Sequence, residues 1–174
     1  MADNTTQIKE WLREHQISEV ECLVPDMTGN ARGKFIPAHQ FLSRGEPRLP
    51  ESILIQTVTG EYCDDHWDFV EPTDTDMILR PDADTLRVVP WAREPTAQII
   101  HDCYTHDGRL HPLSTRNVLR GILDLYKAEG LTPVIAPEVE FFLVSRNTDP
   151  DIELRPPEGR SGRPGPGLLP RPTE

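Results

Sequence analysis

Apolar and polar positions alternate with a period of two near the start of this chain. Val20, Cys22 and Val24 are separated by single residues of other types, which is the spacing of one buried strand face. A second extended run covers residues 31–36, after the turn-forming sequence Pro-Asp-Met-Thr-Gly-Asn. The two runs together predict a β-hairpin.

Four further apolar runs predict strands at residues 53–58, 77–79, 86–89 and 97–104. Pro81, Pro90 and Pro95 stand beside these runs, and proline suits the ends of strands better than their interiors. Trp91 follows one run directly and is predicted to anchor the core. The pattern indicates a sheet of several short strands.

Helical spacing occurs in three places. Residues 4–17 place Ile8, Trp11 and Leu12 on one face, and Pro37 can begin a helix of one to two turns. The clearest helix runs from residues 112–114 to Gly130. Its apolar stripe consists of Val118, Leu119, Ile122, Leu125 and Tyr126. A strand at residues 131–135 is predicted to follow.

The segment Ala136-Pro137-Glu138-Val139-Glu140-Phe141-Phe142-Leu143-Val144 carries the main candidate chemistry. In an extended strand, Glu138 and Glu140 share a face with their tips roughly 7 Å apart, while the apolar side chains fill the other face. Two such charges repel by about 2 kcal/mol at an effective dielectric of about 20, and a bound cation relieves the repulsion. A divalent metal site is one interpretation. Solvation of both glutamates is another, and a glycosidase pair is a third.

This segment resembles the first active-site strand of the glutamine synthetase family, in which a small residue and proline precede Glu-x-Glu, two aromatic residues and an aliphatic one. The resemblance implies that Glu138 and Glu140 bind two different divalent cations, Mg or Mn. Glu138 corresponds to the metal beside the ATP phosphates, and Glu140 to the metal at the glutamate and amine side.

Three other stretches agree with the family in order and position. They are Pro25-Asp26-Met27-Thr28-Gly29-Asn30-Ala31-Arg32-Gly33-Lys34, Leu79-Arg80-Pro81-Asp82 and Thr85-Leu86-Arg87-Val88-Val89-Pro90-Trp91. The resemblance covers most of residues 17–164 and implies an α+β fold. We expect a docking helix at residues 1–16, a β-grasp domain at 17–108, the truncated start of the catalytic domain at 112–148, and a disordered Pro/Gly-rich tail at 149–174.

The resemblance implies the N-terminal fragment of an ATP-dependent glutamate–amine ligase that is inactive alone, because the ATP site and the other metal ligands lie beyond its end. The stretches 49–52 and 159–164 are similar to the branch that ligates glutamate to polyamines. The family's ammonium-binding Asp is absent from the stretch around Glu51, which makes ammonia the less expected amine. A frameshift or premature stop after Pro164 is our hypothesis for the divergent end.

A non-catalytic role is the alternative function. Family active sites form between neighbouring subunits, so the fragment is alternatively an interaction module that associates with full-length synthetase subunits. The full-length form is expected to be a homo-oligomer.

Composition narrows the possible partners. A net charge of −11 and a pI near 5.0 disfavour nucleic acid and anionic membranes. No apolar run approaches the roughly 20 residues of a membrane span, and the polar N-terminus differs from a signal peptide, so the sequence predicts a cytoplasmic protein. Cys22, Cys63 and Cys103 lack the spacing of a disulfide framework or a zinc site.

Two further clusters are interpreted as structural rather than metal-binding. The acidic stretch at residues 61–76 lacks the spacing of a calcium loop and is predicted to be a solvated loop beside a cleft. His101, His106 and His111 recur every five residues, which fits neither a helix face nor a strand face. They are predicted to be loop or surface histidines.

Overall fold

The computed structural model of the chain describes residues 4–43, 46–62, 64–149, 151–159 and 162. Contacts divide the chain into two compact units between residues 133 and 134. Each unit is described by itself.

The first unit is a mixed sheet with helices. Its strands are β1 (Glu19–Pro25), β2 (Ala31–Pro37), β3 (Arg48–Pro50), β4 (Asp76–Pro81), β5 (Arg87–Val88) and β6 (Thr96–Tyr104). The order across the sheet is β2-β1-β6-β4-β3, and β5 also pairs with β6. The β1–β6 pair is parallel, and the other pairs are antiparallel.

The sheet curls so that its two edges approach each other. Lys34 Nζ on β2 donates a hydrogen bond of 2.5 Å to the carbonyl oxygen of Arg48 on β3, although these strands are the opposite edges of the sheet. The β1–β2 hairpin makes two contacts with the segment after β3: Asn30 Nδ2 in the turn donates to Val58 O at 3.3 Å, and Arg32 Nη2 on β2 donates to Thr57 O at 2.7 Å. The result is a partially closed sheet.

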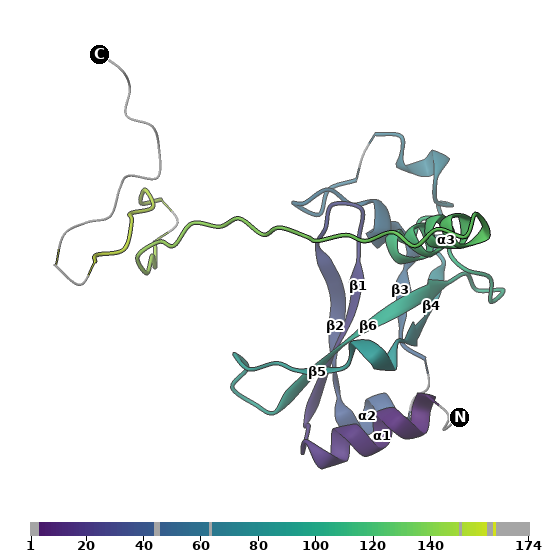
Figure 1. Cartoon of the computed structure of the whole chain (residues 1–174), viewed down its shortest axis with the longest axis horizontal. Helices are drawn as coiled ribbons and strands as arrows, with labels where there is room; N and C mark the ends of the chain where they lie inside the picture. The colour runs from purple at the N-terminus through teal and green to yellow at the C-terminus, as the bar shows by residue number, and fades with distance from the viewer. Residues whose placement is uncertain (1–3, 44–45, 63, 150, 160–161, 163–174) are drawn as a thin grey trace. The chain divides into compact units, whose positions relative to one another are not determined.

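Helices lie at both ends of the strands (Figure 1). They are α1 (Asn4–Glu14), α2 (Ala38–Ser43) and α3 (Thr115–Ala128), and the 3-10 turns are η1 (Glu51–Ile55), η2 (His66–Asp68) and η3 (Ala83–Thr85). Helices α1 and α2 lie together at one end, and α3 lies at the other. None of the helices in the described ranges is both long and apolar enough to cross a bilayer.

The alternation in β1 and β6 explains where the core forms. Val20, Cys22 and Val24 are buried on β1, as the period of two predicts, and Ala97 and Ile99 are buried beside them on β6. Two apolar clusters result. One joins α1 to the sheet through Ile8, Leu12, Val20, Cys22, Ala97 and Ile99, and the other joins Val24, Leu49, Leu54, Met77, Leu79 and Cys103.

Most elements of the first unit match the sequence predictions. The hairpin, the strands at residues 77–79 and 97–104, and all three helices are confirmed. The strand predicted at 53–58 is wrong, because residues 51–55 form the 3-10 turn η1 and the local strand is β3. Trp91 does not anchor the core, since it is exposed in a turn.

The second unit contains no helix or strand within its described residues. The strands predicted at 131–135 and across Glu138 and Glu140 are therefore wrong for this chain. A strand needs a partner for its backbone N–H and C=O groups. Apart from the bond from Leu131 N to Tyr126 O at the end of α3, residues 131–144 have no such partner in the described part of the chain; the bond from Ser145 N to Arg155 O comes after them. In the tail, residues 150, 160–161 and 163–174 lie outside the described residues.

Candidate functional site

Glu138 and Glu140 lie on an exposed, extended segment of the second unit. Their neighbours are exposed as well, among them Val139, Phe141 and Phe142, which are 81%, 74% and 78% exposed. The sequence predicts a buried apolar face opposite the two carboxylates. The structure shows no such face in the described part of the second unit, because no second layer of residues covers these side chains there.

The chemistry of this pair suits a hard divalent cation, but the pair supplies only part of a coordination sphere. Carboxylate oxygens are the preferred ligands of Mg²⁺, which takes six oxygen atoms, and Mn²⁺ also suits such ligands. Within the residues that the structure describes, no group of three or more His, Cys, Asp or Glu side chains is arranged to hold a metal ion. Glu138 and Glu140 could therefore hold a cation only together with water or further ligands.

Asp26 organises the turn between β1 and β2. Its buried carboxylate accepts hydrogen bonds from Thr28 N, Thr28 Oγ1 and Asn30 N at 2.8–2.9 Å, and from Arg32 Nε at 2.6 Å. Burial by itself would raise the pKa of Asp26, but the hydrogen bonds from Arg32, Thr28 and Asn30 outweigh it and lower the pKa. This part of the family-like stretch thus has a structural role in shaping the hairpin.

Glu51 and His111 form a contact that sequence reasoning missed. His111 Nε2 lies 3.2 Å from Glu51 Oε2, and the histidine side chain is only 3% exposed. Both residues line a cavity of about 220 Å³, together with Phe69, Glu71 and Asp76. His111 therefore lies in a loop, which is one of the two predicted positions, but it is buried and not at the surface. A residue separation of 60 left no local signal in the sequence.

The acidic stretch at residues 61–76 is largely exposed, as predicted. One of its members has a structural function. Asp74 accepts hydrogen bonds from Ser52 N and Ser52 Oγ at 3.0 and 2.8 Å, and Ser52 Oγ also lies 3.1 Å from the hydroxyl of Tyr62. These contacts attach the acidic loop to η1, beside Glu51.

Four charged side chains connect α3 to the sheet. Arg116 and Arg120 of α3 both contact Asp82 and Asp102, with Arg116 Nε 3.0 Å from Asp102 Oδ1 and Arg120 Nη2 3.2 Å from Asp82 Oδ2. Asn117 Nδ2 adds a bond of 2.8 Å to Cys103 O. The helix therefore contacts its own sheet through its polar side.

Burial shifts the pKa of three titratable groups away from values that suit catalysis. Burial raises the pKa of the Cys22 thiol to about 12 and that of Cys103 to about 11, so both are protonated and unreactive. His101 is fully buried on β6, which contradicts the prediction of a loop or surface histidine, and burial lowers its pKa to about 4. Cys63 lies outside the described residues.

Comparison with known proteins shows which proteins are similar to this chain. The homologues of this chain are members of the glutamine synthetase family, which match about 80% of it. No protein-family model matches the chain. Glutamine synthetase of Thermotoga maritima is 29% identical over 142 residues, which are 80% of this chain and 30% of the relative.

Two relatives are ligases for larger amines. Gamma-glutamylputrescine synthetase PuuA of Escherichia coli K12 is 28% identical over 158 residues, covering 88% of this chain and 33% of that protein. Glutamate–isopropylamine ligase of a Pseudomonas species is 29% identical over 148 residues, covering 80% and 31%. The chain thus spans about a third of the length of these curated relatives.

A solved structure supports the fold. The GmaS/ADP complex in its conformation 1 has a TM-score of 0.54 and 20% sequence identity, and the match covers 74% of this chain and 26% of that one. At this identity the likeness concerns the fold alone.

Proposed function

We propose that this chain is the N-terminal part of an ATP-dependent glutamate–amine ligase and is inactive alone. The observation that carries the proposal is its collinear similarity, over about 80% of its length, to glutamate ligases whose own length is about three times as great. In this chemistry the side-chain carboxylate of glutamate is phosphorylated by ATP, and an amine then displaces the phosphate. The ATP site would lie largely outside this chain.

The domain organisation follows from the same proposal. We assign residues 17–108 to a β-grasp domain preceded by a docking helix at 1–16, residues 112–148 to the start of the catalytic domain, and 149–174 to a Pro/Gly-rich tail. The parallel β1–β6 pair flanked by the β1–β2 hairpin is compatible with this assignment. Cytoplasmic location and homo-oligomer formation by a full-length form belong to the proposal too.

In the proposed site, Glu138 and Glu140 hold divalent cations, Mg or Mn, in a full-length enzyme. When bound, such cations would neutralise charge on the transferring phosphoryl group. The two glutamates would need a strand conformation to face the same side, and a neighbouring strand would supply the backbone partners that this segment lacks.

The amine is proposed to be larger than ammonia. The stretch around Glu51 lacks the Asp expected of ammonia-using enzymes, and two relatives are named for putrescine and isopropylamine ligation. A polyamine is the first candidate, because the net charge of −11 favours cationic substrates.

Two measurements test the proposal. Isothermal titration with Mn²⁺ should show weak binding that falls at least about tenfold in the double variant Glu138→Gln/Glu140→Gln, which is about 1.4 kcal/mol. Glu153→Gln is the matched control, since Glu153 is an exposed glutamate of the same unit. Equal loss in the control, or no loss in the double variant, would remove the metal assignment. ATP-dependent γ-glutamyl transfer by the isolated chain would refute its inactivity.

A non-catalytic interaction module is the second candidate, because α3 presents its apolar side to solvent in the first unit. Val118, Leu119 and Leu125 are 54%, 55% and 65% exposed, and an exposed apolar stripe is typical of an interface. The chain should then co-purify with a full-length synthetase, and Leu125→Glu should abolish this while Val88→Glu, at an exposed position on β5, should not. Failure of the unsubstituted chain to co-purify would count against this role.

A further inference from the structure

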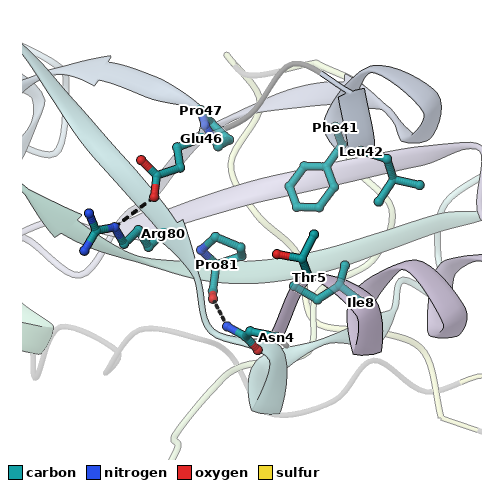
Figure 2. A pocket seen from close by; sticks show the side chains of 9 residues that line it. All are labelled: Asn4, Thr5, Ile8, Phe41, Leu42, Glu46, Pro47, Arg80 and Pro81. Carbon is teal, nitrogen blue, oxygen red and sulfur yellow. Dashed lines mark hydrogen bonds and ion pairs between the residues drawn. The ribbon is translucent and has the colours of Figure 1, made fainter. Parts of the chain in front are cut away.

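A cavity between α1, α2 and β4 has an apolar end and a charged end. Its volume is about 250 Å³, and its apolar wall consists of Ile8, Phe41, Leu42, Pro47 and Pro81. In Figure 2, Glu46 and Arg80, which form an ion pair, lie on one side of the view, and Ile8, Phe41 and Leu42 lie on the other. The cavity belongs to the first unit and uses none of the carboxylates proposed above as metal ligands.

The charged end of the cavity carries a positive and a negative side chain next to each other. Arg80 Nε donates to Glu46 Oε1 at 2.8 Å, and the two side chains are 46% and 44% exposed. The guanidinium lies over the ring of Tyr104, with Cζ 4.1 Å from the ring centroid, which braces its plane. A guanidinium has five N–H donors, and the contacts to Glu46 and Tyr104 engage a minority of them. Donors therefore remain for a second carboxylate, and Glu46 Oε2 remains for a cation.

We propose that this cavity binds a free apolar α-amino acid of about the size of leucine. The carboxylate of the amino acid would bind the Arg80 guanidinium, and its ammonium group would bind Glu46. Its aliphatic side chain would contact the apolar wall formed by Ile8, Phe41 and Leu42. The arrangement is complementary in charge at one end and in polarity at the other.

Volume and charge both favour this ligand over the alternatives. The cavity is smaller than the roughly 300–1,000 Å³ of sites for drug-sized ligands, and at about 30 Å³ for each water-sized group it holds about eight groups, close to the heavy-atom count of leucine. A simple anion could use only the remaining donors of Arg80, and a simple cation could use only Glu46 Oε2. A zwitterion gives each member a new partner.

Calorimetric titration of the full chain tests the proposal with three probes: L-leucine, isovalerate, which lacks the amino group, and isoamylamine, which lacks the carboxylate. Leucine should bind with a dissociation constant on the order of 1 mM, as suits so few atoms, and at least about tenfold more tightly than either half. Equal affinity for all three probes, or no saturation by leucine at concentrations about tenfold above that constant, would overturn the proposal.

Two variants assign the two ends of the ligand. Glu46→Gln should weaken leucine and isoamylamine about tenfold and leave isovalerate unchanged, whereas Arg80→Gln should weaken leucine and isovalerate and leave isoamylamine unchanged. Arg109→Gln is the matched control, because Arg109 Nε forms an exposed pair of the same 2.8 Å length with Asp107 away from this cavity. Loss of leucine binding in the control, or retention in both test variants, would refute the assignment. If Arg80→Gln unfolds the chain, the titration of Glu46→Gln and the comparison of the three probes still test the proposal.

Discussion

Gly33 on β2 is predicted to be the least replaceable glycine of the hairpin. A Cβ atom added at this position would lie 2.0 Å from the carbonyl oxygen of Cys22 and 3.3 Å from the Cα of Leu23. Ordinary carbon–oxygen contacts are about 3.3–3.6 Å, so the two strands would have to separate by more than about 1 Å. The obstacle is backbone, which no rotamer change can remove.

The expected loss in the free energy of unfolding for Gly33→Ala depends on which of the two strands is displaced. Cys22 is fully buried in the core on β1, whereas β2 is an edge strand, so β2 would be displaced. Overpacking costs about 1–3 kcal/mol, and each weakened ladder hydrogen bond adds about 1 kcal/mol. We expect a loss of about 3 kcal/mol in the free energy of unfolding, which corresponds to roughly 6–12 °C in Tm for a chain of this size.

Urea unfolding followed by circular dichroism measures this cost. Gly121→Ala is the control, because a Cβ at Gly121 meets no atom within 4 Å and the residue lies inside α3, where alanine is favoured over glycine by about 1 kcal/mol. Hydrogen exchange should quicken at β1 and β2 only in Gly33→Ala. If the free energies of unfolding of Gly33→Ala and the unsubstituted chain differ by less than about 0.5 kcal/mol, which is below the usual cost of overpacking, the predicted clash is wrong.

Three further predictions concern polar side chains of the first unit. Burial lowers the pKa of His101 to about 4, so the folded chain favours the neutral form of this side chain. The free energy of unfolding should therefore fall by about 3 kcal/mol as pH drops from 6.5 to 4. In His101→Leu, the free energy of unfolding should depend less on pH over this range. Asp26 has a lowered pKa, so its stabilisation should be present above its unfolded pKa and lost as pH falls through its folded pKa, and Asp26→Asn should cost about 3 kcal/mol in urea unfolding at neutral pH. Arg116→Met should cost about 2 kcal/mol by separating α3 from Asp82 and Asp102, measured as faster hydrogen exchange in α3; unchanged exchange there would contradict it.

Local patterns predicted the β1–β2 hairpin because it is stabilised by near neighbours. The hairpin joins strands separated by a short turn, and Asp26 satisfies that turn through residues two to six positions away. Contacts between distant residues were not predictable. The pair of His111 and Glu51 spans 60 positions, and the contacts of Asp82 with Arg116 and Arg120 span 34 and 38; only the folded topology brings these charges together.

The candidate metal site shows a different limit. Residues 136–144 have the composition of a strand, but a strand is not stable without a neighbour that accepts and donates its backbone hydrogen bonds. The spacing of Glu138 and Glu140 was therefore informative about which side chains could act together. It was not informative about whether this chain supplies the sheet that would hold them in that arrangement.

Helix α3 shows why periodicity alone misjudges what a face contacts. An apolar stripe such as that of Val118, Ile122 and Leu125 usually faces the core of its own domain, yet the residues that contact the sheet are Arg116 and Arg120, on the opposite side of the helix. The spacing of the apolar residues correctly identifies the apolar face of the helix, but it does not identify the surface that this face contacts. Because ion pairs and the bond from Asn117 attach the polar side of the helix to the sheet, the apolar side is free to be covered by another surface. The same distribution of charges that anchors α3 therefore leaves an apolar stripe without charged residues, as the core of an interface requires.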